Sequence, residues 1–391
     1  MELQGFLASK PLYYKEIDHE RVHIAYALLK PHIKRPPTVH LVGTNGKGST
    51  GRMVAHLAQK SGLLVGHYSS PHILKFNERI WLDGFDVSDA LLEMAHQELF
   101  SLLGERISDS LSYFEYTTLL AFVVFQNCDL MVLEAGLGGE FDATNVCDKE
   151  LSILTPIGLD HQAFLGETIE EIATTKINSI QKKVLIAPQI YDEVLEIAKD
   201  ICQEKNAELF TVGVGLVPTL DVENSKGRHE TYPYGWADYL ISNAQVAMRA
   251  LDILDISYDI NYLKTLELFG RFYPLTPNIR IDVGHNPLAS QAIVKALDAP
   301  VVLIYNSLDD KDYEEVLRIL KPKIKRVEII AIESQRATTR EEIEKALDKL
   351  EIKYSDFEGK IEEEEKYLVF GSFYVVEAFL KSKEKTLQIC S

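Results

Sequence analysis

The stretch that most constrains this chain is Thr38 to Thr50, which reads TVHLVGTNGKGST. Its β-branched first half is typical of a buried strand, and a helical pattern begins after the glycine-rich run GTNGKGS at 43–49. A strand, a glycine-rich turn and a helix N-terminus in this order bind anions, because backbone amides and the positive helix end face one point. Lys47 adds a positive charge for the outer phosphates. The stretch therefore predicts a nucleotide phosphate loop.

This loop departs from the usual phosphate-binding pattern in two places. The usual loop needs a glycine five residues before the Gly-Lys pair, and Leu41 occupies that position. Ser49 stands one residue later than the pattern requires, because Gly48 is inserted. The alternative interpretation is a glycine-rich turn that serves only backbone geometry, but Lys47 and the flanking strand and helix favour phosphate binding.

Composition narrows the class of protein. At 391 residues the chain is too long for one typical core, so two domains are expected. Its apolar content of 46% and charged content of 26% are those of a globular protein. The 41 basic residues against 59 acidic ones give a net charge of −18, which argues against binding nucleic acid or an anionic membrane.

The cysteines and the N-terminus predict where the protein works. Cys128, Cys147, Cys202 and Cys390 show no Cys-x-x-Cys spacing, so neither a zinc site nor a disulfide framework is expected. Charged residues interrupt the N-terminal stretch, so it lacks the apolar core of a signal peptide. No apolar run approaches the ~20 residues that cross a bilayer. We therefore expect a cytoplasmic protein, and we expect it to be a monomer.

Short apolar runs alternate with helical patterns along the first part of the chain. Strands are expected at 38–42, 63–68, 130–133, 151–154 and 184–186, and helices at 17–34, 50–60, 88–103, 113–127 and 168–180. Between them, 73–80 shows no clean period and is expected to be a long functional loop. This alternation predicts a parallel α/β sheet with ligands at the carboxyl ends of its strands. The phosphate loop, Ser70, Glu134 and His161 all follow expected strands.

A second α/β region is expected towards the C-terminus. Short strands and loops are expected over 205–235 and a helix over 237–253, and the prolines at 274 and 277 favour an irregular linker at 273–279. Beyond it, strands are expected at 279–283, 301–305, 327–332 and 367–370, and helices at 288–298, 312–320, 339–350 and after 370. The sequence therefore predicts a first domain over 1–272 and a smaller one over 280–391.

Specific motifs are spread over nearly the whole chain. They are GTNGKGST at 43–50, SPHILKFNERI at 70–80, FEYTT at 114–118, EAGLGGEFDATN at 134–145, GLDH at 158–161, LGET at 165–168, Lys176, Asn243-Ala244, Gly270-Arg271, DVGHNP at 282–287, DKD at 310–312 and Gly371-Ser372. In this order they resemble the folylpolyglutamate synthase/dihydrofolate synthase family, a branch of the Mur ligase superfamily of ATP-dependent amide-bond ligases.

The resemblance implies a P-loop-type parallel-sheet ATPase domain followed by a Rossmann-like α/β domain. It implies that ATP phosphorylates a carboxylate of dihydropteroate or (tetrahydro)folate and that the amine of L-glutamate attacks the resulting acyl phosphate. Phosphorylation is needed because a carboxylate is a poor electrophile at neutral pH. No protein nucleophile is required, so catalysis should rest on positioning and charge neutralisation.

The resemblance also assigns residues. ATP would be bound by Gly46, Lys47, Gly48, Ser49, Asn243, Arg271, Asp282 and His285. Two Mg²⁺ would be held by Ser70, Glu134 and His161, with Lys176 as a further ligand if it is carbamylated. The pterin site would be lined by Asp18, Phe114, Glu115, Tyr116, Thr117, Phe141, Asp142 and Ala143. Lys47, His161 and Lys176 are the expected catalytic residues. Taken singly, each of these would have an ordinary structural reading, and only their joint occurrence in order favours the site.

Three positions depart from the family pattern. Lys176-Ile177-Asn178-Ser179 replaces Lys-Ala-Gly-Ile, Asp18 is followed by His19-Glu20-Arg21 as if Leu-Gly were deleted, and Glu140 replaces an arginine. The first change lies beside the lysine that the resemblance implies is carbamylated, and the other two lie in segments that the resemblance implies contact the pterin.

Two other functions are compatible with some of the motifs. They are a Mur-type ligase acting on a cell-wall nucleotide precursor and a nucleotide-binding regulatory ATPase. SPHILKFNERI and FEYTT disfavour the first, and the second α/β region disfavours the second. A catalytically inactive binding protein is disfavoured because Lys47, Ser70, Glu134 and His161 are all present.

Overall fold

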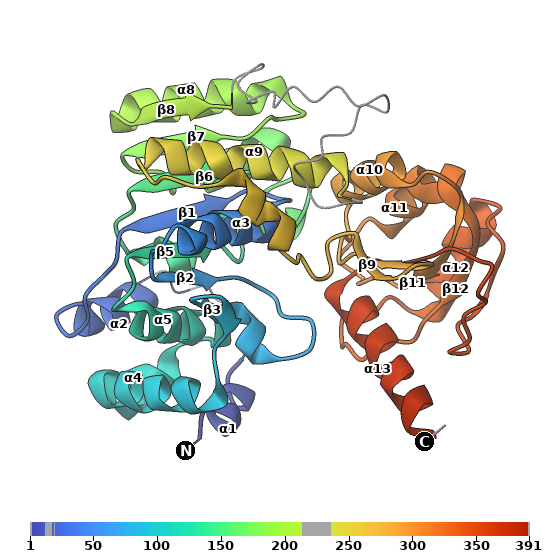
Figure 1. Ribbon diagram of the computed structural model, residues 1–391, viewed down its shortest axis with the longest axis horizontal. Helices are drawn as coiled ribbons and strands as arrows, with labels where there is room; N and C mark the ends of the chain where they lie inside the picture. The colour runs from blue at the N-terminus through green and yellow to red at the C-terminus, as the bar shows by residue number, and fades with distance from the viewer. Residues whose placement is uncertain (1, 12–17, 19, 213–235, 390–391) are drawn as a thin grey trace. The chain divides into compact units, whose positions relative to one another are not determined.

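The computed structural model describes residues 2–11, 18, 20–212 and 236–389. These residues form two compact units, each built around one sheet (Figure 1). The first unit contains Met1–Ile157, Leu165–Thr231 and Asn243–Leu266, and the second contains Gly158–Phe164, Tyr232–Ser242 and Glu267–Ser391. Within the described residues, no helix is both long and apolar enough to cross a membrane. The expected α/β class is confirmed.

The first unit contains an eight-stranded sheet in the order β4-β3-β2-β5-β1-β6-β7-β8. All neighbours from β2 to β8 are parallel, whereas β3 and β4 pair antiparallel at one edge. The strands are β1 Thr38–Val42, β2 Val65–Tyr68, β3 Ile80–Leu82, β4 Phe85–Asp86, β5 Leu130–Glu134, β6 Leu151–Leu154, β7 Lys183–Ile186 and β8 Glu208–Thr211. All five residues of β1 are buried between β5 and β6, so the phosphate loop leaves the middle of the sheet.

Helices cover both faces of this sheet. They are α1 Leu3–Ala8, α2 Arg21–Leu29, α3 Lys47–Lys60, α4 Asp89–Ser110, α5 Tyr113–Phe125, α7 Ile169–Ile177 and α8 Asp192–Lys205, and α9 Asp238–Ile253 follows later in the chain. Neighbouring residues of β2 show the two faces. A Cβ on Gly66 would lie 2.3 Å from the Phe125 ring of α5, whereas His67 lies 2.7 Å from a Cβ built on Gly51 of α3. Since side chains alternate along a strand, α3 and α5 lie on opposite faces.

Several helices begin at a capping box. Ser112, Thr168 and Thr339 each accept a bond from the backbone amide three residues later, and a glutamate at that position bonds back to the cap. These caps start α5, α7 and α12 Arg340–Lys349. The prediction of a loop over 73–80 is wrong in part, because Phe76–Arg79 forms a 3-10 helix and β3 begins at Ile80. The expected strands and loops over 205–235 include β8, and 213–235 lies outside the described residues.

The second unit contains a six-stranded sheet in the order β13-β12-β11-β14-β10-β9. Its elements are β9 Tyr273–Thr276, β10 Ile279–Ile281, α10 Pro287–Ala296, β11 Val301–Tyr305, α11 Tyr313–Leu320, β12 Ile324–Ile329, α12, β13 Tyr354–Asp356, β14 Tyr367–Phe370 and α13 Phe373–Ile389, and α6 Gln162–Leu165 begins in the segment 158–164. The core packs α10, α11 and α12 against Leu303, Val327 and Leu368.

The irregular linker expected at 273–279 is not observed. Residues 273–276 form β9, which pairs antiparallel with β10 through Tyr273, Pro274 and Thr276. The sequence reasoning was wrong because it treated prolines as breakers. Proline lacks a backbone donor, but β9 is the edge strand of its sheet, and a missing donor is tolerated there.

Candidate functional site

The phosphate loop is a tight turn between β1 and α3. Gly43 has a φ of 144°, and a Cβ there would lie 2.1 Å from Thr155 Oγ1, so only glycine fits. Gly46 is the N-cap of α3 with a φ of 88°, and it has no side chain to satisfy the first amides of the helix. Amides at an uncapped helix N-terminus of this kind are the donors that bind phosphate oxygens.

Two lysines from different helices meet at one carbonyl oxygen of this loop. Lys47 Nζ donates to the carbonyl oxygens of Gly43 at 3.2 Å and Thr44 at 3.3 Å. Lys176 Nζ, on α7, donates to the Gly43 oxygen at 3.0 Å, and its side chain is only 5% exposed. Two ammonium groups that share an acceptor repel each other, so this place favours an added negative charge.

Ser49 and Asn243 brace the loop. The Ser49 hydroxyl donates to the Gly46 carbonyl at 3.1 Å and accepts from Asn243 Nδ2 at 2.8 Å. A Cβ on Gly46 would lie 3.1 Å from Asn243 Oδ1, so the amide packs directly on the turn. Gly48 lies in the first turn of α3. The structure thus brings together the predicted residues Gly46, Lys47, Gly48, Ser49 and Asn243.

Two of the predicted metal ligands lie beside each other at the ends of neighbouring strands. Glu134 ends β5, is 5% exposed, and accepts a hydrogen bond from the Ser70 amide at 3.2 Å. Both offer hard oxygen atoms, which suit Mg²⁺. Among the described residues, no group of three or more His, Cys, Asp or Glu side chains could hold a metal ion. A pair of oxygen ligands nevertheless fits Mg²⁺, since this ion keeps several waters and shares phosphate oxygens.

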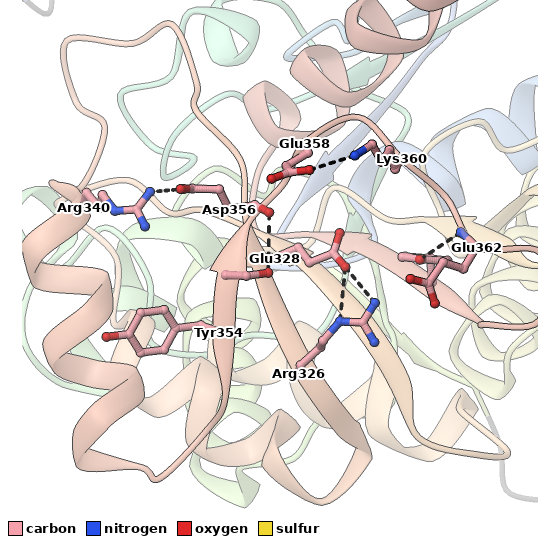
Figure 2. A pocket seen from close by; sticks show the side chains of 10 residues that line it. Arg326, Glu328, Arg340, Tyr354, Asp356, Glu358, Lys360 and Glu362 are labelled. Carbon is pink, nitrogen blue, oxygen red and sulfur yellow. Dashed lines mark hydrogen bonds and ion pairs between the residues drawn. The ribbon is translucent and has the colours of Figure 1, made fainter.

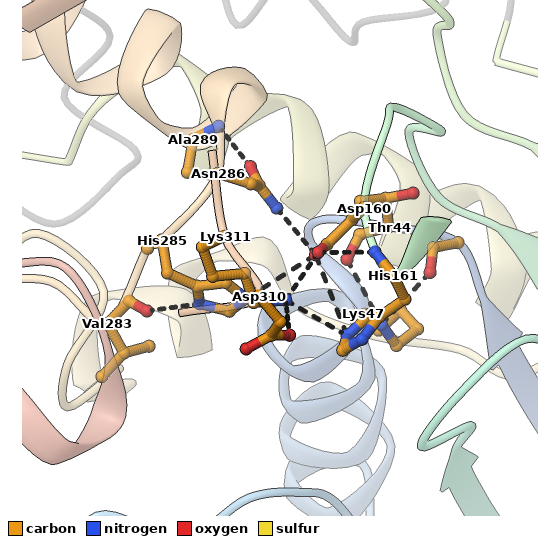
Figure 3. A network of polar contacts seen from close by, with 12 residues as sticks. Thr44, Lys47, Asp160, His161, Val283, His285, Asn286, Ala289, Asp310 and Lys311 are labelled. Carbon is orange, nitrogen blue, oxygen red and sulfur yellow. Dashed lines mark hydrogen bonds and ion pairs between the residues drawn. The ribbon is translucent and has the colours of Figure 1, made fainter. Parts of the chain in front are cut away.

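His161 belongs to a polar network of the second unit that is centred on Asp160 (Figure 3). Lys311 Nζ donates to Asp160 Oδ1 at 2.6 Å and lies 3.5 Å from His161 Nε2. Asn286 Nδ2 donates to Asp160 Oδ2 at 3.2 Å, and His285 Nε2 lies 3.6 Å from the same oxygen. Burial opposes ionisation of Asp160, but the hydrogen bond and charge of His285, with His161 and Lys311, hold its pKa well below the usual value.

Asp282 and Arg271, both predicted to contact the nucleotide, are held by their own unit. Asp282 accepts hydrogen bonds from Tyr239 Oη at 2.9 Å and from two backbone amides. Burial raises the pKa of Asp282, although the charge of Arg271 and these hydrogen bonds act against it. The Arg271 guanidinium lies over the Phe373 ring at 5.3 Å. These contacts fix the backbone that carries Arg271 and His285.

Most of the FEYT residues predicted to line the pterin site have structural partners. Tyr116 and Thr117 are fully buried, and their hydroxyls lie 2.7 Å from His96 Nδ1 and 2.8 Å from the Tyr68 hydroxyl. Glu115 accepts from Arg21 Nε at 2.8 Å and from the Ser112 amide at 2.7 Å. Phe114 is half-buried, with its ring 5.9 Å from that of Tyr68. A contact between Phe114 and a pterin ring stays a prediction.

The other predicted pterin residues differ in exposure. Phe141 is 58% exposed, whereas Asp142 and Ala143 are buried. Asp142 accepts from the Leu137 amide at 2.8 Å and so closes the glycine turn 136–142. Asp18 accepts from the amides of Glu20 at 2.9 Å and Arg21 at 3.3 Å, just before α2. Whether any of them contacts a pterin stays a prediction.

Two of the departures from the family pattern contact each other. Asn178 Nδ2 donates to Glu140 Oε2 at 2.9 Å, and the Glu140 amide donates to the Thr175 carbonyl at 3.0 Å. Glu140 stands where an arginine was expected, and Asn178 lies two residues after Lys176. An arginine at 140 could not accept this bond. The two changes therefore form a matched pair that links the turn 136–142 to the helix of Lys176.

Asp160, Asn286 and Lys311 form the centre of the polar network that includes His161, and the sequence predicted no role for them. They lie within the motifs GLDH, DVGHNP and DKD, respectively. An aspartate, an asparagine and a lysine in motifs spread over about 150 positions carry no spacing signal, so only the fold brings them together.

A hollow of about 600 Å³ lies elsewhere on the second unit (Figure 2). It is lined by charges that are already paired, such as Arg326 with Glu328 at 2.9 Å and Arg340 with Asp356. No predicted site residue is among its lining residues in the described part of the chain. The candidate chemistry therefore lies at the phosphate loop and the Asp160 network rather than in this hollow.

Comparisons with known proteins agree with these features, although no protein-family model matches the chain. The dihydrofolate synthase/folylpolyglutamate synthase of Escherichia coli is 30% identical over 93% of this chain and 91% of that protein. The structure of E. coli FolC in complex with DHPP and ADP is 28% identical, covers 99% of both chains and has a TM-score of 0.85. A bifunctional folylpolyglutamate synthase/dihydrofolate synthase with Mn, AMPPNP and L-glutamate bound is 26% identical over 98% of both chains, with a TM-score of 0.83.

The two α/β units, the phosphate loop and these similarities define an ATP-dependent ligase with the Mur ligase-like fold. Within that class, the chain belongs to the dihydrofolate synthase/folylpolyglutamate synthase family. The family expected from the motifs is thus confirmed.

Proposed function

We propose that this chain adds L-glutamate to dihydropteroate and to (tetrahydro)folate, using ATP and an acyl-phosphate intermediate. The observation that carries the proposal is the phosphate loop, with Lys47 at the N-terminus of α3, in a chain related to these ligases over nearly its whole length. A carboxylate oxygen of the pterin acceptor attacks the γ-phosphorus, and ADP leaves. The glutamate amine then attacks the acyl carbon, loses a proton, and expels inorganic phosphate.

The protein's part in this scheme is positioning and charge neutralisation. The amides at the start of α3 and the Lys47 ammonium would hold the outer phosphates in line with the carboxylate. Ser49 and Asn243 would keep the turn in shape through their 2.8 Å hydrogen bond. Arg271, Asp282 and His285 are proposed to contact the nucleotide. Phe114 and Phe141 are proposed to contact the pterin, with the other predicted residues of 114–117 and 141–143, and Asp18, shaping that site.

Divalent metal would be held by the oxygens of Ser70 and Glu134, and His161 is proposed as a further ligand from the GLDH motif. When bound, Mg²⁺ supplies positive charge to the phosphate oxygens. We propose two such ions, with the second held by a carbamate on Lys176. Carbamylation joins CO₂ to the Lys176 nitrogen, and the ammonium group loses two protons, so the cation becomes an anion where two lysines now crowd the Gly43 oxygen.

A substrate panel tests the proposed function. Purified protein should release phosphate from ATP only when Mg²⁺, glutamate and a pterin acceptor are all present. ATP hydrolysis that needs neither glutamate nor an acceptor would instead indicate a regulatory ATPase. Turnover with a cell-wall nucleotide precursor but with no pterin would indicate a Mur-type ligase. A sedimentation measurement in the same preparation tests the proposed monomer.

Replacing Lys176 tests the carbamate. We expect Lys176→Ala to lower kcat, because the second anion of the site is lost, and we expect acetate to restore part of the activity by supplying that anion. The matched control is Lys182→Ala, which removes an exposed lysine. A variant with unchanged kcat would show that Lys176 serves only to brace the Gly43 carbonyl.

A further inference from the structure

A chain of buried hydrogen bonds joins the strand of the phosphate loop to the turn predicted to line the pterin site. His40 lies in the middle of β1 and is fully buried. Its Nε2 atom lies 2.7 Å from Thr144 Oγ1, and the Thr144 hydroxyl lies 2.6 Å from Asp142 Oδ1. Asp142 in turn holds the Leu137 amide at 2.8 Å. All four residues belong to the first unit.

The direction of these bonds follows from the acceptor at the end. The amides of Leu137 and Thr144 both donate to the Asp142 carboxylate, so its oxygens act as acceptors. The single proton of the Thr144 hydroxyl therefore points at Asp142, and the hydroxyl oxygen must accept from His40. Burial, with a smaller effect of Lys149, holds the pKa of His40 well below its usual value, so the ring is neutral. Its proton must then lie on Nε2.

This histidine is not explained by packing alone. A strand residue that is fully buried is usually apolar, and burying a polar ring without full hydrogen bonding costs free energy. Within the described part of the chain, the Nε2 atom of His40 has a hydrogen-bond partner and its Nδ1 atom has none. An apolar side chain would fill the same place at lower cost. The polar ring therefore indicates that the hydrogen bond it donates is needed at the other end of this series of hydrogen bonds, to hold the Asp142 carboxylate.

We propose that His40 is a positioning residue for the pterin acceptor: through Thr144 it fixes the Asp142 carboxylate and thereby the turn 136–142. The role rests on the proposed function, in which 141–143 line the pterin site. His40 stands on β1, three residues before the Gly43 that begins the phosphate loop, so the hydrogen bonds through Thr144 tie the turn 136–142 to the strand that leads into this loop.

The test compares variants that cut the hydrogen-bond chain at two points. His40→Leu removes the donor and Thr144→Val removes the hydroxyl with little change of shape. Each should raise the KM for dihydropteroate about tenfold, the effect of one lost hydrogen bond to a charged group, and leave the KM for ATP within about twofold. The double variant should be no worse than either single one. His40→Gln, which places an amide donor near the Nε2 position, should restore most of the affinity.

Thr338→Val is the matched control, because Thr338 is buried and its hydroxyl has no partner among the described residues. It should leave both KM values unchanged. A readout that does not need turnover is the tautomer of His40 by ¹⁵N NMR, which should be the Nε2–H form. An Nδ1–H ring, equal changes in both KM values, or additive effects in the double variant would overturn the proposal. A wild-type protein without pterin-dependent turnover would instead reject the proposed function.

Discussion

Lys47→Ala is expected to lower the kcat of glutamate-dependent ATP hydrolysis by about 100- to 1,000-fold, the usual effect of removing one preorganised charge-stabilising donor. Lys47 is the first residue of α3, directly after the Gly46 N-cap. Its ammonium group would therefore neutralise the charge that develops on the transferred phosphoryl group at this end of the helix. In the structure, Lys47 Nζ donates to the Gly43 and Thr44 carbonyls of the same turn. Since alanine is a good helix former, the fold should survive. Steady-state kinetics and a thermal unfolding curve measure both effects.

Lys60→Ala is the control for this prediction. Lys60 is an exposed lysine in the last turn of the same helix, so its removal changes the charge of α3 without touching the loop. Its kcat should match that of the wild type. If Lys47→Ala kept near-normal kcat while Lys60→Ala also did, the phosphate assignment of the loop would be wrong.

Glu134→Gln is expected to lower activity by about 100-fold or more at ordinary Mg²⁺ concentration. Loss of a residue that only hydrogen-bonds to a metal ligand already lowers metal affinity or activity by about 10- to 100-fold, and loss of a direct ligand should cost at least as much. Glutamine keeps the shape of the side chain and an oxygen that accepts from the Ser70 amide, now at 3.2 Å, so the fold should persist. It loses the negative charge that attracts the cation. A Mg²⁺ titration of activity should therefore show a higher half-saturating concentration as well as a lower plateau.

The control for the metal assignment is Glu208→Gln, at an exposed glutamate that begins the edge strand β8. Its Mg²⁺ dependence should equal that of the wild type. A Glu134→Gln variant with the same Mg²⁺ dependence as wild type would show that Glu134 only anchors the Ser70 backbone.

Periodicity was enough to predict the parallel sheets, because buried parallel strands are short apolar runs such as 130–134 and 151–154. It failed where tertiary pairing decides the outcome. β9 contains Pro274 and is stable only as an edge strand beside β10. The two-residue strand β4 is too short for any periodic signal.

Local motifs predicted the phosphate loop but not the residues that hold it. Lys176 was found through the family resemblance, yet its hydrogen bond to the Gly43 oxygen joins positions 133 residues apart. The Glu140–Asn178 pair shows the same limit. Each change looks like a loss when read alone, and only the 2.9 Å hydrogen bond between them shows that they compensate.

The acyl-phosphate step is tested most directly by following oxygen. Dihydropteroate labelled with ¹⁸O in its carboxylate is incubated with the enzyme, ATP, Mg²⁺ and glutamate, and the released phosphate is analysed by mass spectrometry. Attack of the carboxylate on the γ-phosphorus, followed by loss of phosphate, transfers one labelled oxygen to each phosphate. Phosphate that carries no ¹⁸O, released while the glutamylated product forms, would contradict ligation through an acyl phosphate.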